Sequence, residues 1–382
     1  MADFFRPMSR DKRIGDKLLE FNWGFLLLLC AVASFGFAML YSVADGSLEP
    51  WAMRQMIRFG IGVAILIVVA VIDVRVWMSL AYPAYVISLA LLLGVEVIGF
   101  EGMGAQRWIN LGVIQMQPSE VMKITLVLAL ARYFHGLTLD QVSRPSYLLI
   151  PLVMIGAPVA LVLRQPDLGT AVLLLVGGVS LMFLAGLAWR YFILGGLAAL
   201  AAIPIGWNML HDYQKERVFT FLDPERDPLG AGYHILQSKI ALGSGGLFGK
   251  GFMQGTQAHL NFLPEKHTDF IFTMLAEELG LVGGLTLLSL YFLVLMFGIN
   301  VALKCRNQFG RLLVLGVCVT FFLYVFINTA MVMGLLPVVG VPLPLVSYGG
   351  TAMLSLMVAF GLVMSVYIHR NTEITRNPTA FW

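Results

Sequence analysis

The chain has 382 residues, of which 59% are hydrophobic and only 12% carry a charge. Soluble domains contain about 25% charged residues, so the composition excludes an ordinary soluble protein and indicates one that resides in a lipid bilayer. The formal net charge of +3 is too small to indicate a nucleic-acid partner. The three cysteines lie in or beside apolar runs without metal-ligand spacing, so we expect neither a disulfide nor a metal centre from them.

Apolar runs long enough to cross a bilayer recur along the whole chain. A spanning helix needs about 20 mainly apolar residues, so we predict an all-α polytopic membrane protein with about ten transmembrane helices, residues 1–382 forming a single transmembrane domain. The eighth span is long enough to tilt or to project from the bilayer. We expect the first to be retained, because it lacks an A-x-A cleavage site. The predicted spans are 22–42, 54–72, 77–98, 119–135, 147–163, 168–186, 191–210, 268–303, 311–336 and 349–369.

Lys and Arg in short loops predict which side of the membrane each loop occupies. The basic N-terminal segment, the short basic loops and the C-terminal tail fall on one side, so we expect a multi-pass protein of the bacterial cytoplasmic membrane with both termini in the cytoplasm. The other side receives a large extracytoplasmic loop, 211–266, between the seventh and eighth spans. Because the polar, motif-like stretches gather on this outer side, we place the function there.

Ionisable residues at the predicted spans are candidates for function, because lipid penalises them. Glu120 and Lys123 stand at i and i+3 in the fourth span, on one helix face, where they can neutralise each other. This pair either belongs to a substrate site or is a packing pair that holds helices together. Asp167 precedes the sixth span, and it either serves a substrate site or caps the helix that follows.

The glycine cluster 243–251 lies in the large loop. It is not a nucleotide-binding P-loop, because Lys250 is followed by Gly251 rather than by Ser or Thr. Successive free N–H groups could hold another phosphate, and close packing of the loop onto the helix bundle would equally require glycine. Both interpretations of the cluster stay open.

Residues 233–242 of the same loop predict an amphipathic helix that lies on the outer membrane surface. Ile235, Leu236 and Ile240 are expected to share its lipid-facing side. Lys239 is then expected to reach a lipid-linked diphosphate at headgroup level. The alternative is a water-exposed helix without lipid contact.

Asp269 stands at the mouth of the eighth span, where a partly desolvated carboxylate is suited to act as a general base. His267 lies two residues earlier, and neither an HExxH motif nor a Cys pair accompanies it, so a metal site is not expected. Gln214 would share a helix face with Arg217, three residues later. Outward-facing cations that could hold a diphosphate are Arg54, Arg107, Arg217 and Lys239.

With these residues the chain resembles the SEDS family of peptidoglycan glycosyltransferases, and its elongation branch (the RodA proteins) more than its division branch (the FtsW proteins). The resemblance covers nearly the whole chain in order. The segment GTQAHLNFLPEKHTDF favours the elongation branch. The matching blocks are GAQRWINLG, QPSEVMK, RQPDLGTA, DPERDPLGAGYHILQSKIALGSGGLFGKG, LPEKHTDFIFTMLAEELGLVG and LPVVGVPLPLVSYGGT.

The resemblance implies a ten-helix enzyme that polymerises lipid II, a disaccharide-pentapeptide on undecaprenyl diphosphate, by an inverting displacement of that diphosphate. It makes Asp269, in the HTDF motif, the essential carboxylate. Gln115 stands where some relatives have an arginine, so no basic role is expected there. The resemblance also assigns function to positions that here are Arg54, Glu120, Lys123, Asp167, Gln214 and Arg217, and we add Arg107, Lys239 and His267 as substrate-binding candidates.

The implied partners are a class B penicillin-binding protein (a transpeptidase that crosslinks the new strand), other elongation-complex proteins and membrane lipids. No cofactor is implied, although a divalent cation at the diphosphate stays open. One rival function is a transporter that flips lipid II across the membrane, for which a buried ion pair and the proline-broken segment 337–344 would suit a substrate path. Another is a non-catalytic scaffold for cell-wall enzymes, which the setting of Asp269 disfavours.

Overall fold

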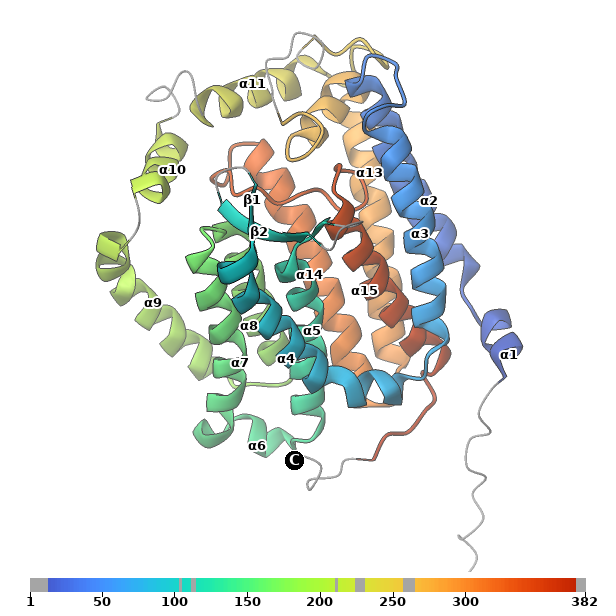
Figure 1. The fold of residues 1–382 in the computed structure, drawn as a ribbon, viewed down its shortest axis with the longest axis vertical. Coiled ribbons are helices and arrows are strands. Elements are labelled where there is room, and N and C mark those ends of the chain that lie inside the picture. The colour runs from blue at the N-terminus through green and yellow to red at the C-terminus, as the bar shows by residue number, and fades with distance from the viewer. Residues whose placement is uncertain are drawn as a thin grey trace, which may run out of the picture.

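The structure, a computed structural model, describes residues 13–102, 105–110, 115–209, 212–223, 231–256 and 265–375. Its long helices form one bundle, with α11 lying across one end of it and α10 to the side near that end (Figure 1). The helices are α1 (Ile14–Leu19), α2 (Trp23–Val43), α3 (Ala52–Val71), α4 (Val74–Ile98), α5 (Pro118–His135), α6 (Leu139–Val142), α7 (Pro145–Arg164), α8 (Leu168–Leu184), α9 (Trp189–Met209), α10 (Asp212–Leu222), α11 (Ala231–Ser244), α13 (Ile271–Lys304), α14 (Gln308–Val332) and α15 (Gly350–Ile368).

Each predicted span coincides with one of the long helices, with boundaries that differ by a few residues. Seven helices in the described part of the chain are long and apolar enough to cross a membrane: α2, α3, α4, α7, α13, α14 and α15. Helix α5 carries three charged residues, α8 is only 17 residues long, and α9 contributes a shorter apolar stretch. The protein is therefore a multi-pass membrane protein, while the number of ten spans stays a prediction.

Several helices begin where the sequence supplies a cap. The side chains of Asn22, Asp73, Asp167 and Asn307 each accept a hydrogen bond from a backbone N–H in the first turn of α2, α4, α8 and α14, respectively. Proline occupies the first position of α5 and α7, where its missing N–H costs nothing. These local signals explain why the predicted starts of most spans agree with the structure.

Two large clusters of buried apolar side chains form the core. One packs α4, α5, α7 and α8 together, and the other packs α2, α3 and α13 together. Helices α14 and α15 contribute side chains to both clusters and so join the two halves of the bundle. Helix α9 lies at the edge (Figure 1), and its residues 193–204 are exposed.

The prediction of an all-α protein was incomplete, because the segment between α4 and α5 contains a small antiparallel sheet. Its strands are β1 (Phe100–Gly102), β2 (Ala105–Asn110) and β3 (Gln115–Met116), in the order β1–β2–β3. Pairing satisfies backbone N–H and C=O groups that an irregular segment would leave unbonded against the bundle. The sheet also brings Arg107, on β2, to the end of the bundle where the loops converge.

Helix α13 is broken at Gly280, whose φ of 66° and ψ of −163° are not helical. The glycine cluster 243–251 supplies the hydrogen bonds that the break removes. Backbone N–H groups of Lys250 and Gly251 donate to the carbonyls of Glu277 and Glu278, at 3.0 Å each. On the far side of the break, the N–H groups of α13 donate to carbonyls of the cluster. Backbone hydrogen bonds thus join the glycine cluster to α13 on both sides of the break.

This packing requires glycine. A Cβ at Gly249 would lie 2.1 Å from the carbonyl oxygen of Glu278, and a Cβ at Gly245 would lie 2.1 Å from that of Ala276. Of the two interpretations of the cluster, close packing onto the bundle is confirmed.

Helix α11 confirms the predicted helix at 233–242, but not the side that it presents. Ile235 is buried, whereas Ile240 is 53% exposed. The reason is Ser238, which is fully buried and bonds to the Thr273 hydroxyl and to the Val332 carbonyl, at 2.8 Å each. These two bonds turn α11 so that its Ile235–Ser238 side faces α13 and α14, and the expectation that Ile235 faces lipid was wrong.

Candidate functional site

A polar cavity of about 350 Å³ lies at one end of the bundle. We use the name "polar cavity" for the space between β2, the first turns of α5, α8 and α15, the middle of α14, the turn before α13 and the loop 339–349. Among its lining residues are the charged side chains of Arg107, Glu120, Lys123, Asp167, Glu265 and Asp269. The structure thus brings five of the residues predicted from the sequence into one space.

Asp269 belongs to the turn 265–270 that leads into α13. Gly340 lines the polar cavity next to it, and a Cβ added there would lie 3.5 Å from the Asp269 Oδ2 atom. The amide of Asn328 on α14 donates to the backbone carbonyl of Asp269 at 3.0 Å. The carboxylate therefore stands at the wall of the polar cavity, on a turn whose backbone is bonded to a helix.

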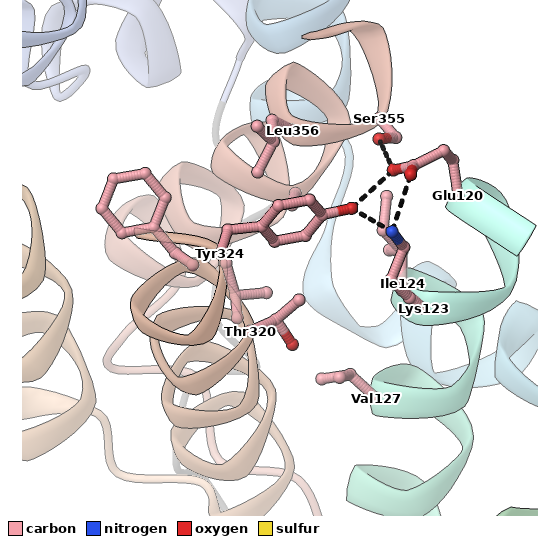
Figure 2. A pocket seen from close by; sticks show the side chains of 11 residues that line it. Glu120, Lys123, Ile124, Val127, Thr320, Tyr324, Ser355 and Leu356 are labelled. Carbon is pink, nitrogen blue, oxygen red and sulfur yellow. Dashed lines mark hydrogen bonds and ion pairs between the residues drawn. The ribbon is translucent and has the colours of Figure 1, made fainter. Parts of the chain in front are cut away.

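Glu120 and Lys123 form the predicted ion pair, with 2.7 Å between Glu120 Oε1 and Lys123 Nζ. Tyr324 on α14 completes the arrangement: its hydroxyl donates to Glu120 Oε2 at 2.7 Å and accepts from Lys123. Ser355 on α15 also donates to Glu120 Oε2, at 3.2 Å. Figure 2 shows these side chains converging from three helices.

This network has both of the properties that were predicted as alternatives. It joins α5, α14 and α15, as a packing pair would. Glu120, Lys123 and Tyr324 also line the polar cavity, so the same groups can meet a ligand there. The ammonium of Lys123 is neutralised by Glu120, and an anionic ligand would compete with that carboxylate for it.

Asp167 likewise has two roles in the structure. Its Oδ1 accepts from the Thr170 N–H at 3.1 Å and its Oδ2 from the Thr170 hydroxyl at 2.9 Å, which is N-cap geometry at the start of α8. Gln117 donates to the same Oδ2 at 3.3 Å. The residue lines the polar cavity as well, so the predicted cap is confirmed without excluding a place in the site.

Arg107 is the cation that β2 brings to the polar cavity. Its Nε donates to the carbonyl of Gln165 at 3.0 Å, and its Nη2 donates to the carbonyl of Pro166. These bonds attach the strand to the turn that carries Asp167. A guanidinium has five N–H donors, so two bonds leave donors for a ligand in the cavity.

Two predicted cations lie elsewhere. Arg54 on α3 is exposed and does not line the polar cavity. One helical turn later, Arg58 places its guanidinium carbon 4.9 Å from the ring centre of Tyr348, which does line it. Lys239 runs across Gly334, where an added Cβ would lie 2.2 Å from Lys239 Cε. Neither Arg54 nor Lys239 is therefore in contact with the cavity in this structure.

His267 lies beside the polar cavity rather than on its wall. Its ring stacks on Trp51, with 4.6 Å between ring centres and 14° between planes. Burial lowers the pKa of His267, an effect that nearby Glu265 opposes and nearby Lys266 reinforces. The stacked ring packs the turn of Asp269 against the start of α3.

Gln214 and Arg217 both belong to α10, so their backbones share a helical segment as expected. Their side chains lie outside the described residues. For a metal ion, no group of three or more His, Cys, Asp or Glu side chains comes together within the described ranges. A cation that is held by one or two carboxylates and a substrate phosphate, as Mg²⁺ often is, needs fewer protein ligands than that.

An apolar groove of about 360 Å³ adjoins the polar cavity between α4, α5 and α15. Its walls are mostly aliphatic and aromatic, for example Trp77, Ile87 and Leu354. Gln117, Glu120 and Thr351 line both spaces. A cavity with charged lining residues thus lies next to a groove with a mainly apolar lining.

Sequence reasoning missed Tyr324, Ser355 and Asn328. The signal for two of them was present: Tyr324 and Asn328 stand at i and i+4 in a mostly apolar span, so they share one helix face. Ser355 carries no comparable signal, because a lone serine in an apolar helix is commonly bonded to its own helix.

Comparison with known proteins shows the family of the chain. The family model for FtsW, RodA and SpoVE, described as cell cycle protein, matches residues 18–372. The peptidoglycan glycosyltransferase MrdB of Escherichia coli (strain K12) is 49% identical over 348 residues, which are 90% of this chain and 93% of that protein.

Two solved structures are similar over nearly their whole length. The rod shape determining protein RodA of Thermus thermophilus has a TM-score of 0.70 at 32% identity, with 92% of this chain and 98% of that chain covered. A chain from work on the structural coordination of polymerization and crosslinking by a peptidoglycan synthase complex has a TM-score of 0.81 at 34% identity, with 92% and 99% covered. The chain therefore belongs to the FtsW/RodA/SpoVE family of multi-pass membrane proteins.

Proposed function

We propose that this protein, a peptidoglycan glycosyltransferase by its family, polymerises lipid II into glycan strands at the outer face of the cytoplasmic membrane during cell elongation. The observation that carries the proposal is the polar cavity, where the carboxylate of Asp269 and the cations Arg107 and Lys123 line one space. It stands in a chain that is 49% identical to a peptidoglycan glycosyltransferase.

In the proposed reaction, the 4-hydroxyl of a GlcNAc unit on one substrate attacks the MurNAc anomeric carbon of another. The C–O bond to undecaprenyl diphosphate breaks as the new glycosidic bond forms, so the α-linked donor becomes β-linked glycan. Asp269 takes the proton from the attacking hydroxyl as general base. Positive charge at the diphosphate stabilises the leaving group.

The cations that would meet the diphosphate are Arg107 and Lys123. Arg107 is tethered by two backbone carbonyls, which holds its guanidinium in place before substrate arrives. Lys123 is shared between Glu120 and Tyr324, so its position is also set in advance. Cations that are held in place before the reaction stabilise the negative charge that develops on the leaving group in the transition state. Asp167, with Thr170 and Gln117, would line the same cavity beside Arg107.

The two adjoining spaces fit the two parts of the substrate. The polar cavity suits the sugar and diphosphate, and the apolar groove between α4, α5 and α15 suits a polyprenyl chain that stays in the lipid. Gln117, Glu120 and Thr351, which line both spaces, would then lie at the junction between diphosphate and lipid. If a divalent cation assists, Asp269 or Asp167 would bind it together with substrate phosphate.

A class B penicillin-binding protein is the proposed partner. Support comes from the similar chain in a peptidoglycan synthase complex in which polymerization and crosslinking are coordinated. Polymer strands leaving this cavity are the substrate for such a crosslinking enzyme.

Polymerisation of lipid II by the purified protein in detergent tests the proposed function. No membrane is present to cross, so a polymerase produces glycan strands and a flippase does not. Glycan chains that grow with time are the expected result. An absence of polymer from folded protein, together with lipid II transfer in vesicles, would favour the flippase instead.

A further inference from the structure

The turn that carries Asp269 is held by three consecutive backbone carbonyls. The carbonyl of His267 accepts from the Tyr348 N–H at 2.9 Å, that of Thr268 from the Ser347 hydroxyl at 2.6 Å, and that of Asp269 from the Asn328 amide at 3.0 Å. Two of the three donors are side chains, and they come from the loop before α15 and from α14. A turn bonded at each residue has little freedom to shift its last side chain.

Asn328 is placed to fix two walls of the polar cavity at once. It is fully buried, and its Nδ2 donates both to Asp269 and to the carbonyl of Val341, at 2.7 Å. Val341 follows Gly340, which faces the Asp269 carboxylate. A Cβ added to Gly340 would lie 3.5 Å from the Asp269 Oδ2 atom. One amide group therefore sets the separation between the carboxylate and the loop that faces it.

Ser347 also joins the turn that carries Asp269 to the loop that faces it. Its hydroxyl donates to Thr268 and accepts from the Leu343 N–H at 2.8 Å, so it ties the turn to the loop 339–349. Ser347 is itself held by Gln55 on α3, whose buried amide donates to the Ser347 carbonyl at 2.9 Å. The chain of bonds runs from α3 through Ser347 to the residue next to Asp269.

We infer that Asn328 and Ser347 are positioning residues for the reaction: they hold the Asp269 carboxylate at the distance from the facing loop at which it can reach the attacking hydroxyl. The inference rests on the proposed role of Asp269. Neither side chain lines the polar cavity, so both act through Asp269. A misplacement of about 1 Å can cost on the order of 100-fold in rate, and loss of either bond removes what prevents such a shift.

The test uses Asn328→Leu and Ser347→Ala, each of which removes one donor. Thr329→Val is the matched control, because among the described residues the Thr329 hydroxyl bonds within its own helix, to the carbonyls of Val325 and Phe326. Polymerisation of lipid II by purified protein gives kcat and KM, and thermal unfolding in detergent reports folding. We expect kcat to fall about 10- to 100-fold in both variants, with KM within about twofold of wild type and with Thr329→Val unchanged.

A fall in kcat at constant KM indicates a lost transition-state interaction where the variant keeps the melting temperature of the wild type, because an unfolded fraction also lowers the apparent kcat. Wild-type kcat in either folded variant, or a KM that rises in step with the fall in kcat, would overturn the inference. If Asn328→Leu does not fold, Ser347→Ala decides alone. Asp269→Asn, measured in parallel, separates the two proposals: an active Asp269→Asn ends the proposed role of Asp269, whereas an inactive one beside fully active Asn328→Leu and Ser347→Ala ends only the positioning role.

Discussion

Gly249 and Gly280 lie so close together that a Cβ added to Gly280 would stand 2.3 Å from the Gly249 backbone nitrogen. This contact joins the large loop to α13 at the point where that helix breaks. Both residues have positive φ, 80° at Gly249 and 66° at Gly280, which is the region that glycine tolerates best. The helix that begins two residues after Asp269 is therefore braced by the loop.

Gly249→Ala is predicted to destabilise the protein through this contact. The added methyl would overlap the Glu278 carbonyl, and overpacking of this kind costs about 1–3 kcal/mol. Gly246→Ala is the matched control: Gly246 also has positive φ, but no atom of the described residues lies within 4 Å of an added Cβ. Melting temperatures in detergent should fall further for Gly249→Ala than for Gly246→Ala. Equal melting temperatures would contradict the close packing described.

Exchange of the charged pair, with Glu120→Lys and Lys123→Glu in one protein, is predicted to restore folding without restoring activity. The ion pair can re-form in the opposite sense, and the exchanged side chains still offer the Tyr324 hydroxyl an acceptor and a donor, so α5 and α14 stay joined. The ammonium, however, would leave the place from which Lys123 is proposed to meet the diphosphate. Thermal unfolding and lipid II polymerisation are measured on both single variants and on the exchange. Recovery of most of the activity by the exchange would make the pair purely structural.

The burial of His267 is predicted to make stability depend on pH. Burial lowers the pKa of His267 below its ordinary value of 6.5, so below about pH 6.5 the unfolded chain binds more protons than the folded protein does. The contribution of His267 to the free energy of unfolding is therefore fully present above that pH. It is lost as the pH falls toward the lowered pKa of the folded protein. The measurement is melting temperature against pH for wild type and for His267→Phe, which keeps a flat ring but no proton. The wild type should lose more stability on acidification, and parallel curves would refute the effect.

The parts of the site that sequence predicts are those that depend on neighbours along the chain. Glu120 and Lys123 share a face because they are three residues apart in a helix, and Asp167 caps α8 because the next turn begins beside it. Tyr324 joins the first pair from more than 200 residues away in sequence. Nothing in the local sequence of α5 indicates which tyrosine of the chain will meet it, so that contact required the fold.

The fold, too, combines features that depend on neighbouring residues with features that depend on distant ones. Apolar runs and caps predict where helices begin and end. The direction in which α11 faces depends on the buried bonds of Ser238 to two other helices, and the break at Gly280 depends on a loop that starts more than 30 residues earlier. Both are tertiary effects that local pattern does not contain.

The proposed role of Asp269 is tested most directly by polymerisation of lipid II by purified Asp269→Asn in detergent. The substitution keeps the volume of the side chain and removes its basicity, and loss of a general base typically costs roughly 10²–10⁴-fold in rate. We predict a folded variant with a wild-type melting temperature that makes almost no glycan. Polymer formed at close to the wild-type rate would contradict it.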